Sequence, residues 1–203
     1  ANPIRLSLVG SEMCIRDSRN QQLESAITNN PDKVDVYKRN IKSLEDGEIP
    51  IYEPGLNDLV KRNVIAGRLY FTTDIDKAVH QSDVVFIAVG TPQGKSGEAD
   101  IVAVESVVRV ISKNLNGYKV ICTKSTVPIG TGRRIINLIR TTIPERAEFD
   151  YVSNPEFLRE GSAVKDFLWP DRVVIGASTD RAFEMKRNVY RPLYVNCLLY
   201  TSD

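Results

Sequence analysis

Short apolar runs alternate along the chain with longer segments in which apolar residues recur at helical spacing. The short runs predict strands at 4–8, 33–36, 69–72, 84–89, 119–122, 150–153 and 173–175. The longer segments predict helices at 40–45, 56–66, 75–81, 101–114, 130–140 and 181–190. This alternation predicts an α/β fold: a doubly wound parallel sheet of the Rossmann-like kind.

Two segments carry the clearest patterns. The run at 84–89 is apolar throughout, which is typical of a strand that is covered on both faces. The helix at 101–114 gathers Val104, Val107, Val108 and Ile111 on one face, so that face is predicted to lie in the core. No internal repeat or low-complexity linker divides the chain, and residues 1–195 are predicted to form a single domain.

Composition and charge exclude several classes of protein. Apolar residues make up 42% of the 203 residues and charged residues 26%, the mix of a soluble globular protein. The 27 Lys and Arg nearly balance the 26 Asp and Glu, which argues against nucleic-acid and polybasic membrane binding. No apolar run approaches the roughly 18 residues of a membrane span. Three scattered cysteines and the single histidine, His80, predict neither a metal site nor a disulfide scaffold, and the expected compartment is the reducing cytoplasm.

Three loops rich in small and polar residues follow predicted strands, at 90–92, 124–132 and 154–161. The carboxyl ends of parallel strands open on one edge of a sheet, where ligands of open α/β proteins bind. Small residues let a ligand approach the backbone, and the hydroxyls and carboxylates supply polar contacts. The sequence therefore predicts a ligand site at this edge.

At these loops the chain resembles the UDP-glucose 6-dehydrogenase branch of the nucleotide-sugar dehydrogenase family. The matching blocks occur in family order over roughly residues 40 to 195. They are 47–56, 86–92, 124–128 and 153–163, followed by 166–167 and 170–172.

The resemblance implies an NAD-dependent, four-electron oxidation of UDP-glucose to UDP-glucuronate, with a small-molecule nucleotide sugar as partner and homo-oligomers among full-length members. It implies a catalytic set of Thr126 and Glu156, which would hold and activate the hydrolytic water, and Glu160, where substrate and cofactor meet. The implied cofactor residues are Asp35, Val89, Gly90, Thr91, Pro92, Ser125, Thr126 and Glu160. The implied substrate residues are Glu156, Phe157, Leu158, Arg159 and Glu160.

Each motif taken alone also has a structural interpretation. The Thr126 hydroxyl could form a hydrogen bond within a turn, and residues 90–92 are typical of a turn as well. Glu156 and Glu160, four residues apart, suit one solvated face of a helix. The occurrence of all the blocks together and in order favours the site.

The beginning of the chain departs from the family pattern. Only Gly10 remains of the Gly-x-Gly-x-x-Gly turn whose amides receive the pyrophosphate, and Glu12 brings a charge of the wrong sign. Residues 8–18, 35–39 and 197–202 correspond to three frames of one short DNA sequence that resembles a transposase-type sequencing adapter. These segments are therefore predicted to be foreign, with 196–203 an artefactual tail and the codon of Asp35 derived from the adapter.

Residues of the family pattern that lie further downstream are absent from this sequence. They are a nucleophilic cysteine, a lysine and asparagine on a later central helix, and a UDP-binding domain, so this chain alone is predicted to be inactive. Two alternatives remain open. One is another nucleotide-sugar 6-dehydrogenase, acting on GDP-mannose or UDP-N-acetylmannosamine. The other is a non-catalytic Rossmann-like module that binds a nucleotide or a partner.

Overall fold

A six-stranded sheet forms the centre of the protein. The computed structural model describes residues 6–9, 43–44, 49, 51–91, 99–196 and 198–201. The expected strand at 33–36, the altered glycine turn, Asp35 and Pro92 lie outside these residues, as does most of the expected helix at 40–45. The strands, in chain order and in sheet order alike, are β1 (Leu6–Val9), β2 (Val84–Ile87), β3 (Tyr118–Thr123), β4 (Glu148–Ser153), β5 (Arg172–Ala177) and β6 (Leu198–Thr201).

The sheet is mixed rather than wholly parallel. Strands β1 to β4 are parallel to one another, with Leu6 opposite Val84 and Val84 opposite Val120. Strand β5 runs antiparallel to β4, and β6 runs parallel to β5. The prediction of a parallel sheet therefore holds for four strands and is wrong at the β4–β5 pair.

The connection between β4 and β5 explains this reversal. A parallel crossover must carry the chain back along the full strand, which is about 20 Å for six residues. The only helix in the connection, α6 (Ala163–Leu168), has six residues and spans roughly 9 Å. The chain thus stays at the carboxyl edge of β4, and β5 returns from there.

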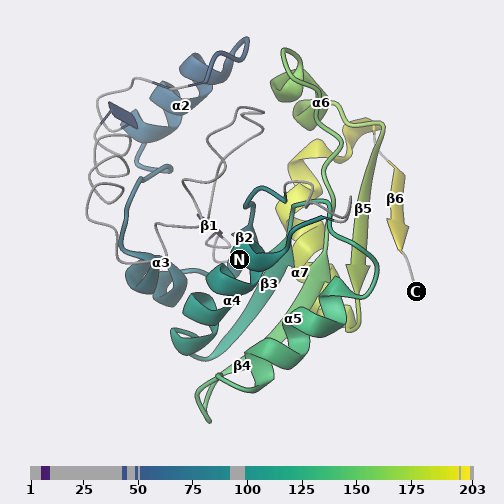
Figure 1. Ribbon diagram of the computed structural model, residues 1–203. Helices are drawn as coiled ribbons and strands as arrows, with labels where there is room; N and C mark the ends of the chain where they lie inside the picture. Colours follow the sequence, from purple (N-terminus) through teal and green to yellow (C-terminus); the bar gives the residue numbers. More distant parts are fainter. Residues whose placement is uncertain are drawn as a thin grey trace.

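Helices pack on both faces of the sheet. The described helices are α2 (Leu56–Ile65), α3 (Ile75–Gln81), α4 (Val102–Lys113), α5 (Thr131–Arg140), α6 and α7 (Asp180–Tyr190), followed by the 3-10 helix η2 (Arg191–Asn196). Figure 1 shows α4 and α5 in front of the sheet and α7 behind it. The predicted helices at 56–66, 75–81, 101–114, 130–140 and 181–190 are confirmed to within one residue at each end.

One predicted strand is wrong. Residues 69–72 are irregular, and the Leu69 N–H donates to the carbonyl of Asn63, near the end of α2, rather than to a strand. Tyr70 in this segment is largely exposed. Its β-branched and aromatic composition suits a strand, but pairing and burial decide whether a strand forms.

The core consists of two apolar layers, one on each face of the sheet. In the front layer, Val104, Val108 and Ile111 of α4 are fully buried, which confirms the predicted core face of that helix. The rear layer packs α7 against alternate residues of β2, β3 and β5. Among the described residues, no helix combines the length and the apolar character that a membrane crossing requires.

Candidate functional site

The exits of β2, β3 and β4 are held in register at one edge of the sheet. The Lys124 N–H donates to the carbonyl of Ile87 (2.8 Å), and the Asn154 N–H donates to that of Thr123 (3.0 Å). The parallel ladder thus extends one residue beyond β3 and β4. The predicted site loops therefore begin side by side.

The exits of β2 and β3 are locked together by two side-chain hydrogen bonds. Thr91 Oγ1 donates to the carbonyl of Thr126 (2.9 Å), and Ser125 Oγ donates to the carbonyl of Val89 (2.6 Å). Four of the predicted cofactor residues are thus brought together, with Gly90 between Val89 and Thr91. Of the remaining three, Asp35 and Pro92 lie outside the described residues, and Glu160 is exposed in the turn before α6.

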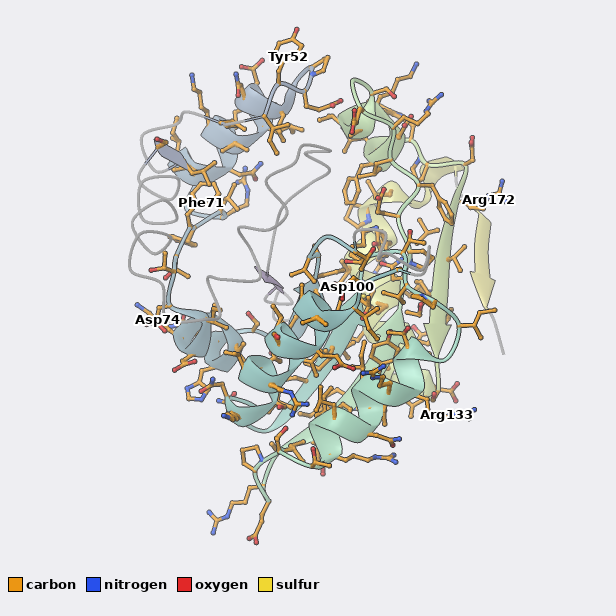
Figure 2. The ribbon with its side chains drawn as sticks, viewed as in Figure 1. Tyr52, Phe71, Asp74, Asp100, Arg133 and Arg172 are labelled. Atoms are coloured by element: carbon orange, nitrogen blue, oxygen red, sulfur yellow. The ribbon has the colours of Figure 1, made fainter. Side chains whose placement is uncertain are left out.

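A pocket of about 630 Å³ lies beyond the ends of β3 and β4. It is lined by Lys124, residues 154–159, most of 165–173 and Tyr190. Four predicted substrate residues, 156 to 159, take part in the lining, whereas Glu160 does not and is exposed. Figure 2 shows Arg172, another lining residue, where β5 begins.

The loop that carries Glu156 and Glu160 is not helical. Residues 154–159 have no regular structure, and the chain turns at 160–162 before α6. Glu156 Oε2 accepts a hydrogen bond from the Leu158 N–H (2.5 Å). The interpretation of these two glutamates as one face of a solvated helix is therefore wrong.

Lys124 connects the residues at the β2 and β3 exits with the residues that line the pocket. Its backbone belongs to the β3 exit, next to Ser125, and its side chain lines the pocket together with Glu156. Burial lowers the pKa of Lys124, and the nearby Cys122 and Glu156 oppose this change. Sequence reasoning assigned no role to Lys124, although a cation directly after a buried strand at the site edge is a usable signal.

Asn154 is a second residue that sequence reasoning missed. Its side chain is almost completely buried, and its Nδ2 donates to the carbonyl of Val174 on β5 (2.7 Å). Its Oδ1 accepts a hydrogen bond from the Tyr190 hydroxyl (2.5 Å). Burial raises the pKa of Tyr190, which keeps that hydroxyl a donor. These bonds fix the start of the 154–161 loop against β5 and α7.

The Arg159 side chain forms an ion pair within the protein. Its guanidinium donates to both oxygens of Asp166, from Nε at 3.0 Å and from Nη2 at 2.7 Å. This bidentate partner holds the pKa of Asp166 well below its usual range. The predicted contact of Arg159 with a sugar nucleotide therefore requires this ion pair to open, or requires the ligand to contact other atoms of the residue.

No group of three or more His, Cys, Asp or Glu side chains within the described part of the chain is arranged to hold a metal ion.

Comparisons with known proteins agree on one family. The model of the NAD binding domain of the UDP-glucose/GDP-mannose dehydrogenase family matches residues 25–194. A UDP-glucose 6-dehydrogenase of Rhizobium meliloti is 54% identical over 166 residues, which is 80% of this chain and 38% of that relative. The chain therefore spans well under half of that protein.

Solved structures of the family have the same fold. A UDP-glucose dehydrogenase from the archaeon Pyrobaculum islandicum is 32% identical and superposes with a TM-score of 0.80. A GDP-mannose dehydrogenase from Pseudomonas aeruginosa, solved as a ternary complex, is 31% identical with a TM-score of 0.78. Each comparison covers 98% of this chain and 46% of the solved chain.

Proposed function

Because the chain belongs to the UDP-glucose/GDP-mannose dehydrogenase family and contains its NAD binding domain, we propose that it forms the cofactor half of a UDP-glucose 6-dehydrogenase. The reaction converts the sugar CH₂OH and one water to a carboxylate, with two NAD⁺ reduced to two NADH and three protons released. The observation that carries the proposal is the pocket beside the locked exits of β2 and β3.

The exits of β2 and β3 fit a dinucleotide. They lie at the carboxyl edge of parallel strands, where open α/β sheets bind such ligands. Val89, Gly90, Thr91, Ser125 and Thr126 are neutral, so no carboxylate among them repels a phosphate. These residues would hold NAD, which would supply the hydride acceptor for oxidation of the sugar.

The residues of this chain would bind the sugar and move protons around that step. In the proposed site, Glu156 and Thr126 hold the water that completes the second oxidation, and Glu160 lies where sugar and cofactor meet. Alcohol oxidation and the addition of water both release protons, which a carboxylate beside the reacting carbon accepts. The lining of the pocket by both Lys124 and Glu156 supports this assignment, since it places a cation and a carboxylate together beside the exit of β3.

GDP-mannose is the second candidate substrate. The specific observation in its favour is the TM-score of 0.78 with the Pseudomonas aeruginosa GDP-mannose dehydrogenase, nearly equal to the value for the archaeal UDP-glucose enzyme. The identity of 54% with the Rhizobium meliloti protein favours UDP-glucose. We place the reaction in the cytoplasm as part of this proposal, since the free thiol of Cys122 is compatible with a reducing compartment.

The decisive experiment joins residues 51–196 to the remaining segments of the Rhizobium meliloti relative. NADH formation is then followed at 340 nm with UDP-glucose, GDP-mannose and UDP-N-acetylmannosamine. We expect two NADH per UDP-glucose and little turnover of the other sugars. The 203-residue chain alone should form no NADH. If the joined protein oxidises none of the three sugars but binds NAD or UDP in calorimetry, a non-catalytic binding module replaces the proposal.

A further inference from the structure

The buried carboxylate of Glu53 holds a loop that lies 108 residues further along the chain. Glu53 Oε2 accepts a hydrogen bond from the Gly161 N–H at 2.9 Å. The residue is 7% exposed, and its other oxygen, Oε1, has no hydrogen-bond donor among the described residues. The turn that presents it is itself fixed, because the carbonyl of Glu53 accepts from the Leu56 N–H (3.0 Å) at the start of α2. The neighbouring Tyr52, by contrast, points away from the protein (Figure 2).

A second carboxylate holds the same loop from the other side. Asp166 Oδ2 accepts from the Arg159 N–H (3.1 Å) and from Ser162 Oγ (3.2 Å). The peptide groups on both sides of Glu160 are therefore anchored, at Arg159 by α6 and at Gly161 by the turn before α2. Gly161 adopts a φ of +79°, a conformation that favours glycine and lets the chain turn between the two anchors.

Within the described structure, Glu160 is oriented through the backbone on either side of it. The Glu160 side chain is exposed and does not line the pocket, whereas the flanking residues form the anchoring hydrogen bonds. Within the described part of the chain no cation forms an ion pair with Glu53, and burial of such a carboxylate is costly unless its hydrogen bonds are strong. The position of Glu53 thus indicates a role that packing alone does not require.

We propose that Glu53 is a positioning residue, which sets the turn at 159–162 so that the loop 156–159 lines the pocket for the nucleotide sugar. This inference rests on the proposed function of that loop. Removal of the Glu53 carboxylate leaves the cofactor residues at the β2 and β3 exits in place but frees the carboxyl end of the loop that lines the pocket. Binding and turnover of the sugar should then weaken, whereas binding of NAD should not.

Amide hydrogen exchange in the 203-residue chain tests the contact itself. In Glu53→Ala, exchange of the Gly161 N–H should accelerate about tenfold or more, which corresponds to one lost charge-assisted hydrogen bond. Glu53→Gln retains an acceptor oxygen and should restore most of the protection. Exchange at Ile121 in β3 should stay unchanged in both, which separates this effect from general unfolding. Glu145→Ala, in the exposed turn before β4, is the matched control.

Steady-state kinetics in the joined protein described above test the functional consequence. Glu53→Ala should raise KM for the nucleotide sugar and lower kcat/KM about tenfold or more, with KM for NAD unchanged and partial recovery in Glu53→Gln. Unchanged Gly161 exchange, or equal losses for sugar and NAD, would overturn the inference. If the unsubstituted joined protein is inactive, the proposed function fails, and the exchange experiment still decides whether Glu53 holds the loop.

Discussion

Lys186 places an amine inside the apolar layer between α7 and the sheet. The residue is 0% exposed, and its Nζ lies 3.8 Å from the centroid of the Phe86 ring and 5.0 Å from that of Tyr190. Among the described residues the Nζ has no hydrogen-bond partner, and the Cys122 thiol is its polar neighbour. Burial lowers the pKa of Lys186 from 10.5 to about 8, with a smaller contribution in the same direction from Lys124. The contact with the Phe86 ring compensates only part of the free-energy cost of burying the ammonium.

Replacement of Lys186 by methionine should therefore stabilise the fold. Since the side chain keeps its proton up to a pKa of 10.5 when unfolded and only to about 8 when folded, the unfolded state binds more protons between these values. The free energy of unfolding should rise with pH in this window, by up to about 1.4 kcal/mol per unit. Lys186→Met should remove this slope and add about 1–3 kcal/mol at pH 7.

Urea unfolding at pH 7, 8, 9 and 10 measures both effects. The difference between wild type and Lys186→Met isolates the contribution of this amine from that of the other titratable groups. Lys61→Met on the exposed face of α2 is the control and should change neither stability nor slope. An identical pH slope in the two proteins would show that the folded protein does not depress the pKa of Lys186.

At the scale of elements, the first turn of α5 lies in close contact with β4. A Cβ placed on Gly132 would lie 2.7 Å from Cε1 of the Tyr151 ring, which is too close for two carbon atoms. The ring is attached to a central strand, and burial raises the pKa of its hydroxyl. The helix can approach the sheet this closely because residue 132 is glycine.

Gly132→Ala should consequently lower stability, although alanine favours helices by about 1 kcal/mol. Overpacking against a fixed ring costs about 1–3 kcal/mol, so the net loss should be up to about 2 kcal/mol. Thermal unfolding measures this change. Asn137→Ala, on the exposed side of the same helix, should be neutral or slightly stabilising. A stabilised Gly132→Ala protein would mean that α5 shifts away from Tyr151 at no cost.

The elements differ in how much of them the sequence could reveal. The strands β2 and β3 and the helix α4 were predictable because long apolar runs and a wide apolar face leave few alternatives. Helix α6 was missed, since six residues do not complete two helical turns and show no period. The reversal of β5 was missed as well, because it depends on the shortness of the connection that contains α6.

At the scale of the whole molecule, the site edge was predictable and the pocket was not. Parallel topology alone brings the loops after β2, β3 and β4 to one edge. Which side chains line the pocket depends on β5 running back from that edge, which adds Trp169 and Arg172 to the lining that contains Lys124 and Glu156. That arrangement is a consequence of tertiary structure, and no local pattern in the sequence encodes it.

The same arrangement makes the only tryptophan of the chain a reporter for the pocket. Trp169 lines it and is 64% exposed, so acrylamide reaches the indole freely when the pocket contains only water. UDP-glucose bound against Lys124 should shield the indole. Acrylamide quenching of the fluorescence should therefore fall saturably as UDP-glucose is added. NAD should have little effect, because its predicted residues lie at the β2 and β3 exits. Lys124→Met should weaken this response, since Lys124 is partly buried and lines the pocket from the β3 exit, and Lys61→Met should leave it intact. A response that never saturates, or one that is equal in Lys124→Met, would exclude this pocket as the sugar-nucleotide site while leaving the NAD binding domain assignment untouched.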